Sequence, residues 1–265
     1  MRASFIVIVF MAAACGLACG ERRSKREQPR TIAAGDCLAA LDDAALKEAQ
    51  RKTQTAAPRE RAAAWVSAGH AFVRIARTRT QPELYAHVQA CAGRALEAAP
   101  ADTDALHLQG IVMMDAHRFG EARELAERLI ALDADDVAAW GLLSDASLEL
   151  GNTADAVRAA QRMLDLKPSL LSYGRAAHLR FIGGDVQGAL ELYSLAINAG
   201  RHLKDREPSA WMMVEAAQLF LARGDVIGAE AGFDAALREV PGYAPALAGK
   251  RRAAAVRAGN AQAKL

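Results

Sequence analysis

Apolar residues recur along the chain with the spacing of one face of an α-helix. Within 122–130 they stand at the first, fourth, fifth, eighth and ninth positions, and charged residues fill all the others. The same apolar spacing returns over 189–197. Because a helix has 3.6 residues per turn, this pattern predicts amphipathic α-helices with one buried face.

A second, longer period of about 34 residues repeats this helical pattern. It is marked by four alanines separated by 34, 33 and 40 residues: Ala122, Ala156, Ala189 and Ala229. A glycine stands five residues before three of them, and His117 takes that place before Ala122. A repeat of this length indicates stacked helix pairs, since no single pair can bury its apolar face alone. We therefore expect an all-α chain.

The copy over 137–170 has small residues where two helices must approach closely, at Ser144 and Ala156, and larger ones such as Trp140 and Leu143 between them. This arrangement resembles a tetratricopeptide repeat. Further copies begin near residues 103, 170 and 210, and a stretched first copy has about seven extra residues over 77–83. The resemblance implies a right-handed solenoid of about five repeats over 61–258, ending in a capping helix that begins near Tyr243.

In tetratricopeptide proteins, fixed positions of each leading helix line a concave groove that binds partners. By this resemblance, the partner-binding groove of the present chain is formed by the following residues: His70, Arg74, His107, Asp115, Asp145, Glu149, His178, Trp211 and Gln218. The Lys/Asn/Arg set with which chaperone adaptors hold a terminal carboxylate is missing. We expect a protein or peptide partner of another kind.

The first residues are apolar and end in two Cys-Gly pairs. The uninterrupted apolar stretch 5–14 is shorter than the roughly 20 residues of a membrane-spanning helix and suits a signal peptide. Small residues before Cys15 and Cys19 resemble a bacterial lipobox. We expect a signal peptide over 1–18 and a lipid on Cys19, with Cys15 as the alternative. Gly20 then implies an outer-membrane lipoprotein facing the periplasm, by resemblance to Gram-negative lipoproteins.

The basic segment 21–30 argues against export, because its five Lys and Arg residues oppose translocation of the chain across the membrane. An uncleaved inner-membrane anchor with a cytoplasm-facing body therefore stays open, as does ordinary secretion. In the expected organisation, a basic tether over 19–35 and an N-terminal helix and linker over 36–60 precede the repeats. A tail over 259–265 follows them.

Two cysteines, Cys37 and Cys91, are left once Cys15 and Cys19 are assigned to the leader and the lipid. In an oxidising compartment a disulfide between them would tie an expected helix over 36–52 to the second helix of the first repeat. By closing a long loop, this bond would restrict the unfolded chain and stabilise the fold by about 4 kcal/mol. Two buried free thiols are the alternative.

Composition and motifs add no catalytic chemistry. The net charge is only +2, from 33 basic and 31 acidic residues, which argues against a nucleic-acid binder. The six histidines are scattered without metal-ligand spacing, and the glycine-rich string 183–188 follows a helix, so it is a repeat turn rather than a phosphate loop. We expect no cofactor and no metal.

The expected function is a non-catalytic protein-interaction scaffold that helps assemble a complex in the cell envelope. An envelope enzyme or enzyme subunit with its site in the groove is the alternative from another class. It would be favoured by His107, Asp115, Asp145 and His178 lying within reach of one metal ion. A cytoplasm-facing, membrane-anchored adaptor is the third possibility.

Overall fold

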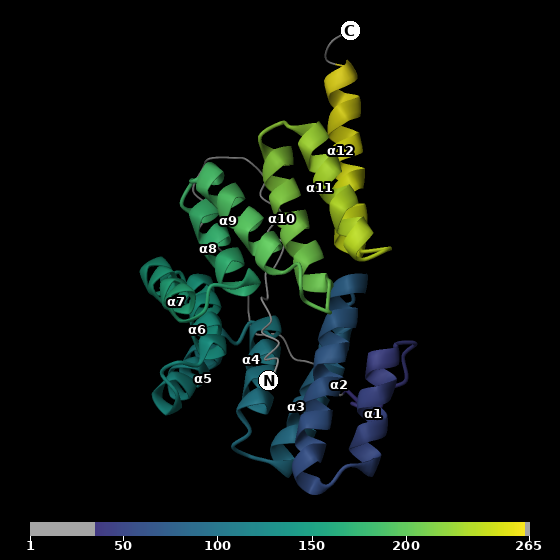
Figure 1. Ribbon diagram of the computed structural model, residues 1–265, viewed down its shortest axis with the longest axis vertical. Coiled ribbons are helices and arrows are strands. Elements are labelled where there is room, and N and C mark those ends of the chain that lie inside the picture. Colours follow the sequence, from purple (N-terminus) through teal and green to yellow (C-terminus); the bar gives the residue numbers. More distant parts are fainter. Residues whose placement is uncertain (1–34, 263–265) are drawn as a thin grey trace. The chain divides into compact units, whose positions relative to one another are not determined.

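All regular secondary structure in the described part of the chain, residues 35–262 of the computed structural model, is helical (Figure 1). This confirms the all-α prediction. The expected signal peptide, Cys15, Cys19 and all of the tether except Gly35 lie outside the described residues. Within 35–262, no helix is both long and apolar enough to cross a bilayer.

The helices follow one another with short connections, and a 3-10 turn (Pro82–Leu84) precedes the third of them. Their bounds are α1 Ala44–Thr55, α2 Pro58–Arg79, α3 Tyr85–Ala98, α4 Thr103–Asp115, α5 Phe119–Leu132, α6 Val137–Glu149, α7 Thr153–Leu166, α8 Leu170–Ile182, α9 Val186–Ala199, α10 Glu207–Ala222, α11 Val226–Glu239 and α12 Ala244–Gln262.

The chain divides into two compact units. Of the described residues, the first unit holds 35–72 together with Tyr85–Ala156, and the second holds Val73–Leu84 together with 157–262. The end of α2 therefore belongs to the second unit, whereas its larger part belongs to the first.

The core of the first unit contains the period-marking alanines predicted from the sequence. Ala122 and Ala156 are fully buried, and Ala122 packs in one apolar cluster with Leu125, Leu129 and Leu142. The hydroxyl of Ser144 on α6 donates a hydrogen bond of 2.9 Å to the carbonyl of Ala156 on α7. Small residues at these positions let neighbouring helix backbones approach closely, as the repeat pattern requires.

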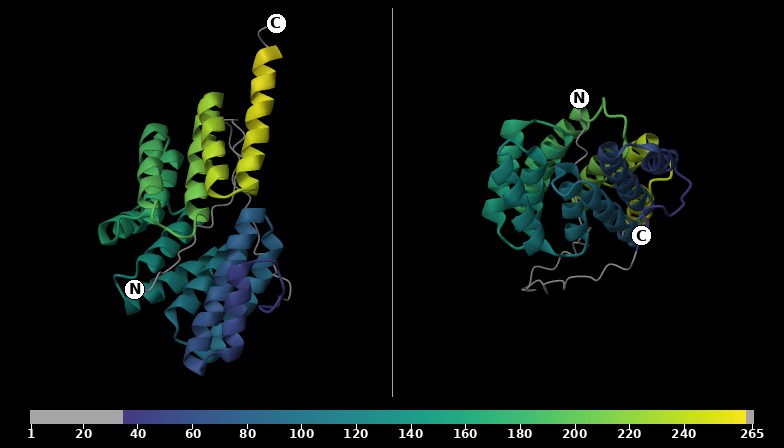
Figure 2. Two further views of the ribbon diagram at one scale, coloured as in Figure 1. Left: turned by 45° about the vertical axis from the view of Figure 1, so that its right-hand side comes forward. Right: turned by 90° about the horizontal axis from the view of Figure 1, so that it is seen from below.

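In the second unit, Ala189 and Ala229 are likewise fully buried. Helices α10, α11 and α12 share one core, in which Phe233 and Tyr243 are the largest buried side chains. The long helix α12 runs beside α11 (Figure 2). Lys250 contacts Asp234 of α11 at 2.5 Å, and the next residues, Arg251 and Arg252, are exposed, so α12 acts as the polar cap that a repeat array needs.

The turns between paired helices follow the predicted chemistry. Asp185 and Asp225 cap α9 and α11 by accepting the backbone N–H groups of Gly188 and Gly228. Gly184 adopts a left-handed backbone with φ +85°, and His117 has φ 57° in the equivalent turn. The repeated glycine is therefore explained by backbone conformation, and His117 occupies a position that favours glycine.

One local expectation, the start of the first helix, is wrong. The first helix begins at Ala44 rather than near Asp36, because the Asp43 side chain accepts the N–H of Leu46 and starts the helix there. The extra residues 77–83 extend α2 to Arg79 and form part of the 3-10 turn Pro82–Leu84 that precedes α3. The insertion therefore lengthens a helix.

Candidate functional site

The nine predicted groove residues are divided between the two units. In the first unit they lie on α2, α4 and α6: His70, His107, Asp115, Asp145 and Glu149. In the second unit they lie at the end of α2 and on α8 and α10: Arg74, His178, Trp211 and Gln218.

His107 is tied to the next repeat. Its Nε2 atom lies 2.8 Å from Oδ2 of Asp136, whose other oxygen, Oδ1, accepts the N–H groups of Ala138 and Ala139 at the start of α6. Burial raises the pKa of Asp136, but the bond and charge of His107 and the two amides outweigh this, so the net pKa is lowered. This groove residue therefore has a structural task, the joining of α4 to the cap of α6.

The other predicted groove residues of the first unit differ in exposure. Asp145 is buried, at 7% exposed, so the expectation that its side chain is accessible to a partner in the groove is wrong. Glu149, one turn further along α6, is exposed, while His70 and Asp115 are partly buried. Asp145 and Glu149 share one side of α6, so the difference in exposure follows position along the helix, of which Glu149 is the last residue.

In the second unit, His178 is partly buried, and burial lowers its pKa to about 4. Its imidazole is therefore neutral near pH 7. Trp211 packs against the α10–α12 core with a buried indole nitrogen, and Met212 beside it is buried. The two side chains consequently form no exposed aromatic patch. Gln218 donates a hydrogen bond of 3.2 Å to Glu215 on the same helix.

Sequence reasoning missed a buried polar cluster in the second unit. Glu207, the first residue of α10, is 4% exposed and accepts a hydrogen bond of 2.8 Å from the hydroxyl of Tyr243. A guanidinium nitrogen of Arg77, near the end of α2, lies 4.0 Å from its other oxygen. Burial raises the pKa of Glu207, while Arg77 and Tyr243 lower it in part. The residues added to α2 thus supply a cation to a buried carboxylate.

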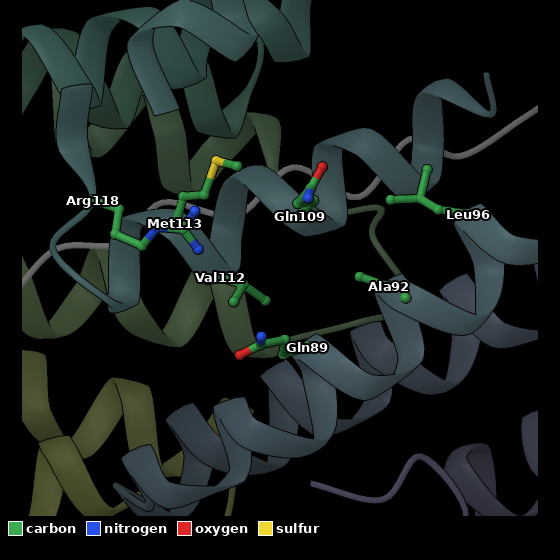
Figure 3. A pocket seen from close by; sticks show the side chains of 8 residues that line it. Gln89, Ala92, Leu96, Gln109, Val112, Met113 and Arg118 are labelled. Atoms are coloured by element: carbon green, nitrogen blue, oxygen red, sulfur yellow. The ribbon is translucent and has the colours of Figure 1, made fainter. Parts of the chain in front are cut away.

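The sequence also did not reveal a pocket of about 190 Å³ between α3 and α4 in the first unit. Its α3 wall is formed by Gln89, Ala92, Gly93 and Leu96. Its other wall is formed by Gln109, Val112 and Met113 of α4, with Arg118 from the following turn. Figure 3 shows Met113 and Arg118 at one end and Leu96 at the other. None of the nine predicted groove residues lines it.

The remaining candidate sites concern metals and cysteines. Among residues 35–262, no group of three or more His, Cys, Asp or Glu side chains is placed to hold a metal ion. Cys37 and Cys91 are joined by a disulfide, with their Cα atoms 4.9 Å apart. Near it, the backbone N–H of Asp36 donates a hydrogen bond to His87 of α3. The segment before α1 is thereby attached to the first repeat.

Comparison with known proteins agrees with this helix-pair architecture. Residues 113–178 match the tetratricopeptide repeat family model. No match was found among curated proteins. The fold is similar to that of a thermophilic tetratricopeptide-repeat protein from Thermus thermophilus, with 18% identity, 71% of this chain and 98% of that chain covered, and a TM-score of 0.56.

Two further solved structures are less similar. MamA is 21% identical over 61% of this chain and 91% of its own, with a TM-score of 0.42. YrrB, described as having an unusual peptide-binding site, is 15% identical over 78% of this chain and 98% of its own, with a TM-score of 0.43. Residues 113–178 thus match tetratricopeptide repeats, and the fold of the chain is that of a protein built from such helix pairs.

Proposed function

We propose that this protein is a non-catalytic scaffold that binds a protein or peptide partner through the leading helices of its repeats. The observation that carries the proposal is the tetratricopeptide fold itself, because stacked helix pairs of this kind form extended binding surfaces. The accessible polar side chains on the leading helices, such as Glu149 and the partly buried His70, supply contacts for a partner.

We also propose that the scaffold works in the cell envelope, held by a lipid on Cys19 and facing the periplasm from the outer membrane. The short apolar leader and the two Cys-Gly junctions support this placement. The disulfide between Cys37 and Cys91 supports it as well, because such bonds persist in oxidising compartments and are rare in the cytosol. Complex assembly in the envelope is the task that this location and a binding surface suggest.

Partner binding is tested by crosslinking intact cells and capturing the protein with its partners. A His70→Ala, Glu149→Ala variant removes accessible groove side chains and leaves His107 bonded to Asp136. Its matched control is Glu124→Ala, Arg128→Ala, which changes two exposed residues on the second helix α5. The proposal expects at least about tenfold less captured partner with the first pair, the effect of losing one or two good polar contacts. Equal capture by both pairs contradicts a groove-bound partner.

Lipid attachment is tested by metabolic labelling with palmitate. Label should disappear in Cys19→Ser and persist in Cys15→Ser if Cys19 is acylated, and the reverse result would assign Cys15. Label that persists in the double variant refutes acylation at either cysteine. Membrane fractionation of the same strains then separates an outer-membrane protein from an inner-membrane anchor.

A further inference from the structure

The pocket between α3 and α4 is lined by none of the predicted groove residues. Its α3 residues Gln89, Gly93 and Leu96 are spaced by four and three positions, so they lie on one side of that helix. On α4, Gln109 and Met113 are likewise four residues apart. The groove residue His107 is two positions from Gln109, a spacing that places the two side chains on different sides of the helix.

The size of the pocket suits one apolar side chain. A cavity of about 150 Å³ is large enough to hold benzene, and this pocket measures about 190 Å³. Gly93 lines the pocket, and a Cβ atom placed at this exposed residue would meet nothing within 4 Å. Leu96, Val112 and Met113 supply apolar walls. A side chain of leucine size therefore fits.

The polar groups of the pocket suit a peptide backbone rather than a charged ligand. Gln89 and Gln109 stand on opposite helices (Figure 3), and each carboxamide has both a donor and an acceptor, as a peptide group does. The one cation, Arg118, donates a hydrogen bond of 2.7 Å to Glu121 and is thereby balanced by an adjacent carboxylate. The charge of the pocket thus complements a neutral segment.

We propose that this pocket is a second binding site, which takes a leucine-sized side chain from an uncharged, extended segment of a partner protein. Gln89 and Gln109 bind the peptide groups on either side of that residue. This proposal rests on the scaffold function and adds to it a defined site and the chemistry of its ligand.

The test is a titration of the full chain with small blocked amino acids, followed by nuclear magnetic resonance at the side-chain amides of Gln89 and Gln109 and the methyl group of Met113. The probe is N-acetyl-leucine-N′-methylamide, and the matched probe is the alanine derivative. The leucine probe should give saturable shifts with a dissociation constant of about 1 mM, as expected for so small a ligand. The alanine probe should bind at least about tenfold more weakly, because it buries fewer methyl groups.

The Gly93→Leu variant places a bulky apolar side chain on a residue that lines the pocket, where an added Cβ atom meets nothing within 4 Å. Its matched control is Gly259→Leu on α12, another exposed helical glycine whose Cβ would meet nothing within 4 Å. Both variants should keep the helical content of the wild type. Leucine-probe binding should be lost in Gly93→Leu and unchanged in Gly259→Leu.

Three results would overturn the proposal. They are an absence of saturable shifts at the pocket signals, equal binding by wild type and Gly93→Leu, and saturation by 1-octanol without binding of the leucine probe. The last result would assign the pocket to an acyl chain. If crosslinked partners are absent from cells while the leucine probe binds as described, the scaffold function fails and the pocket chemistry stands.

Discussion

Gly183 and Gly184 are adjacent, exposed glycines at the end of α8 that differ in backbone conformation, so they allow one structural explanation to be tested against a close control. Gly184 has φ +85°, whereas Gly183 has φ −73°. An added Cβ meets nothing within 4 Å at Gly184 and only ordinary contacts, at 3.4 and 3.5 Å, at Gly183. Packing therefore contributes little to either alanine substitution.

The expected effects of the two substitutions then follow from backbone energetics. Alanine restricts the unfolded chain similarly at both sites, which stabilises the fold by about 0.4–1 kcal/mol. Only Gly184→Ala also carries the cost of a left-handed alanine, about 1–2 kcal/mol. We expect Gly183→Ala to be more stable than wild type and Gly184→Ala to be less stable. The difference between the two free energies of unfolding should be about 1–2 kcal/mol.

The measurement is equilibrium urea unfolding followed by far-ultraviolet circular dichroism, with wild type and both variants side by side. Thermal unfolding should give the same order, with about 2–4 °C between variants for each kcal/mol. Gly184→Asn should lose less stability than Gly184→Ala, because asparagine tolerates the left-handed region better. Equal or greater stability of Gly184→Ala relative to Gly183→Ala would refute the explanation of the repeated glycine.

Three further predictions concern the two units separately. Replacing both Cys37 and Cys91 with serine should lower the unfolding free energy by about 4 kcal/mol, because the bond joins residues 54 apart in sequence; the loss should match that of reduced wild type in urea unfolding. Tyr243→Phe removes a hydrogen bond to the buried Glu207 carboxylate and should cost about 1.5–3 kcal/mol in the same assay, whereas an unchanged midpoint would mean that this bond contributes no net stability. Burial raises the pKa of Glu215 from 4.5 to about 7, against the opposing charge of Arg252, so the folded state holds this proton more tightly than the unfolded state. Stability should therefore fall as the pH rises from about 4.5 to about 7. Glu215→Gln should flatten this slope and be more stable than wild type by about 3 kcal/mol above pH 7, since each unit of pKa shift corresponds to about 1.4 kcal/mol; a slope unaffected by the substitution would contradict the assignment.

The helices and their pairing could be predicted from the sequence because both depend on local spacing. The buried face of an amphipathic helix is fixed by its 3.6-residue period, and Ala122, Ala156, Ala189 and Ala229 are all fully buried. The caps Asp185 and Asp225 and the left-handed Gly184 depend on only a few neighbouring residues. Such features need no knowledge of distant parts of the chain.

The candidate sites were predicted less well, because exposure depends on which other elements cover a helix. The repeat register assigned Asp145 and Trp211 to the groove, yet Asp145 is buried and Trp211 packs against the α10–α12 core. His107 was placed on the correct helix, but its bond to Asp136 requires two repeats to be stacked. The repeat register predicts which side of its helix a side chain occupies, but it does not predict which other elements pack against that side.

The sequence by itself thus determined an array of α-helices, its alanine-rich contacts and the chemistry of its turns, since each follows from residues within one or two helical turns. Only the tertiary structure decided where Arg77 meets Glu207 and Tyr243, and where α3 and α4 leave a pocket beside Gly93. These features arise from side chains that belong to different helices and share no period, so they exist only once the helices have packed.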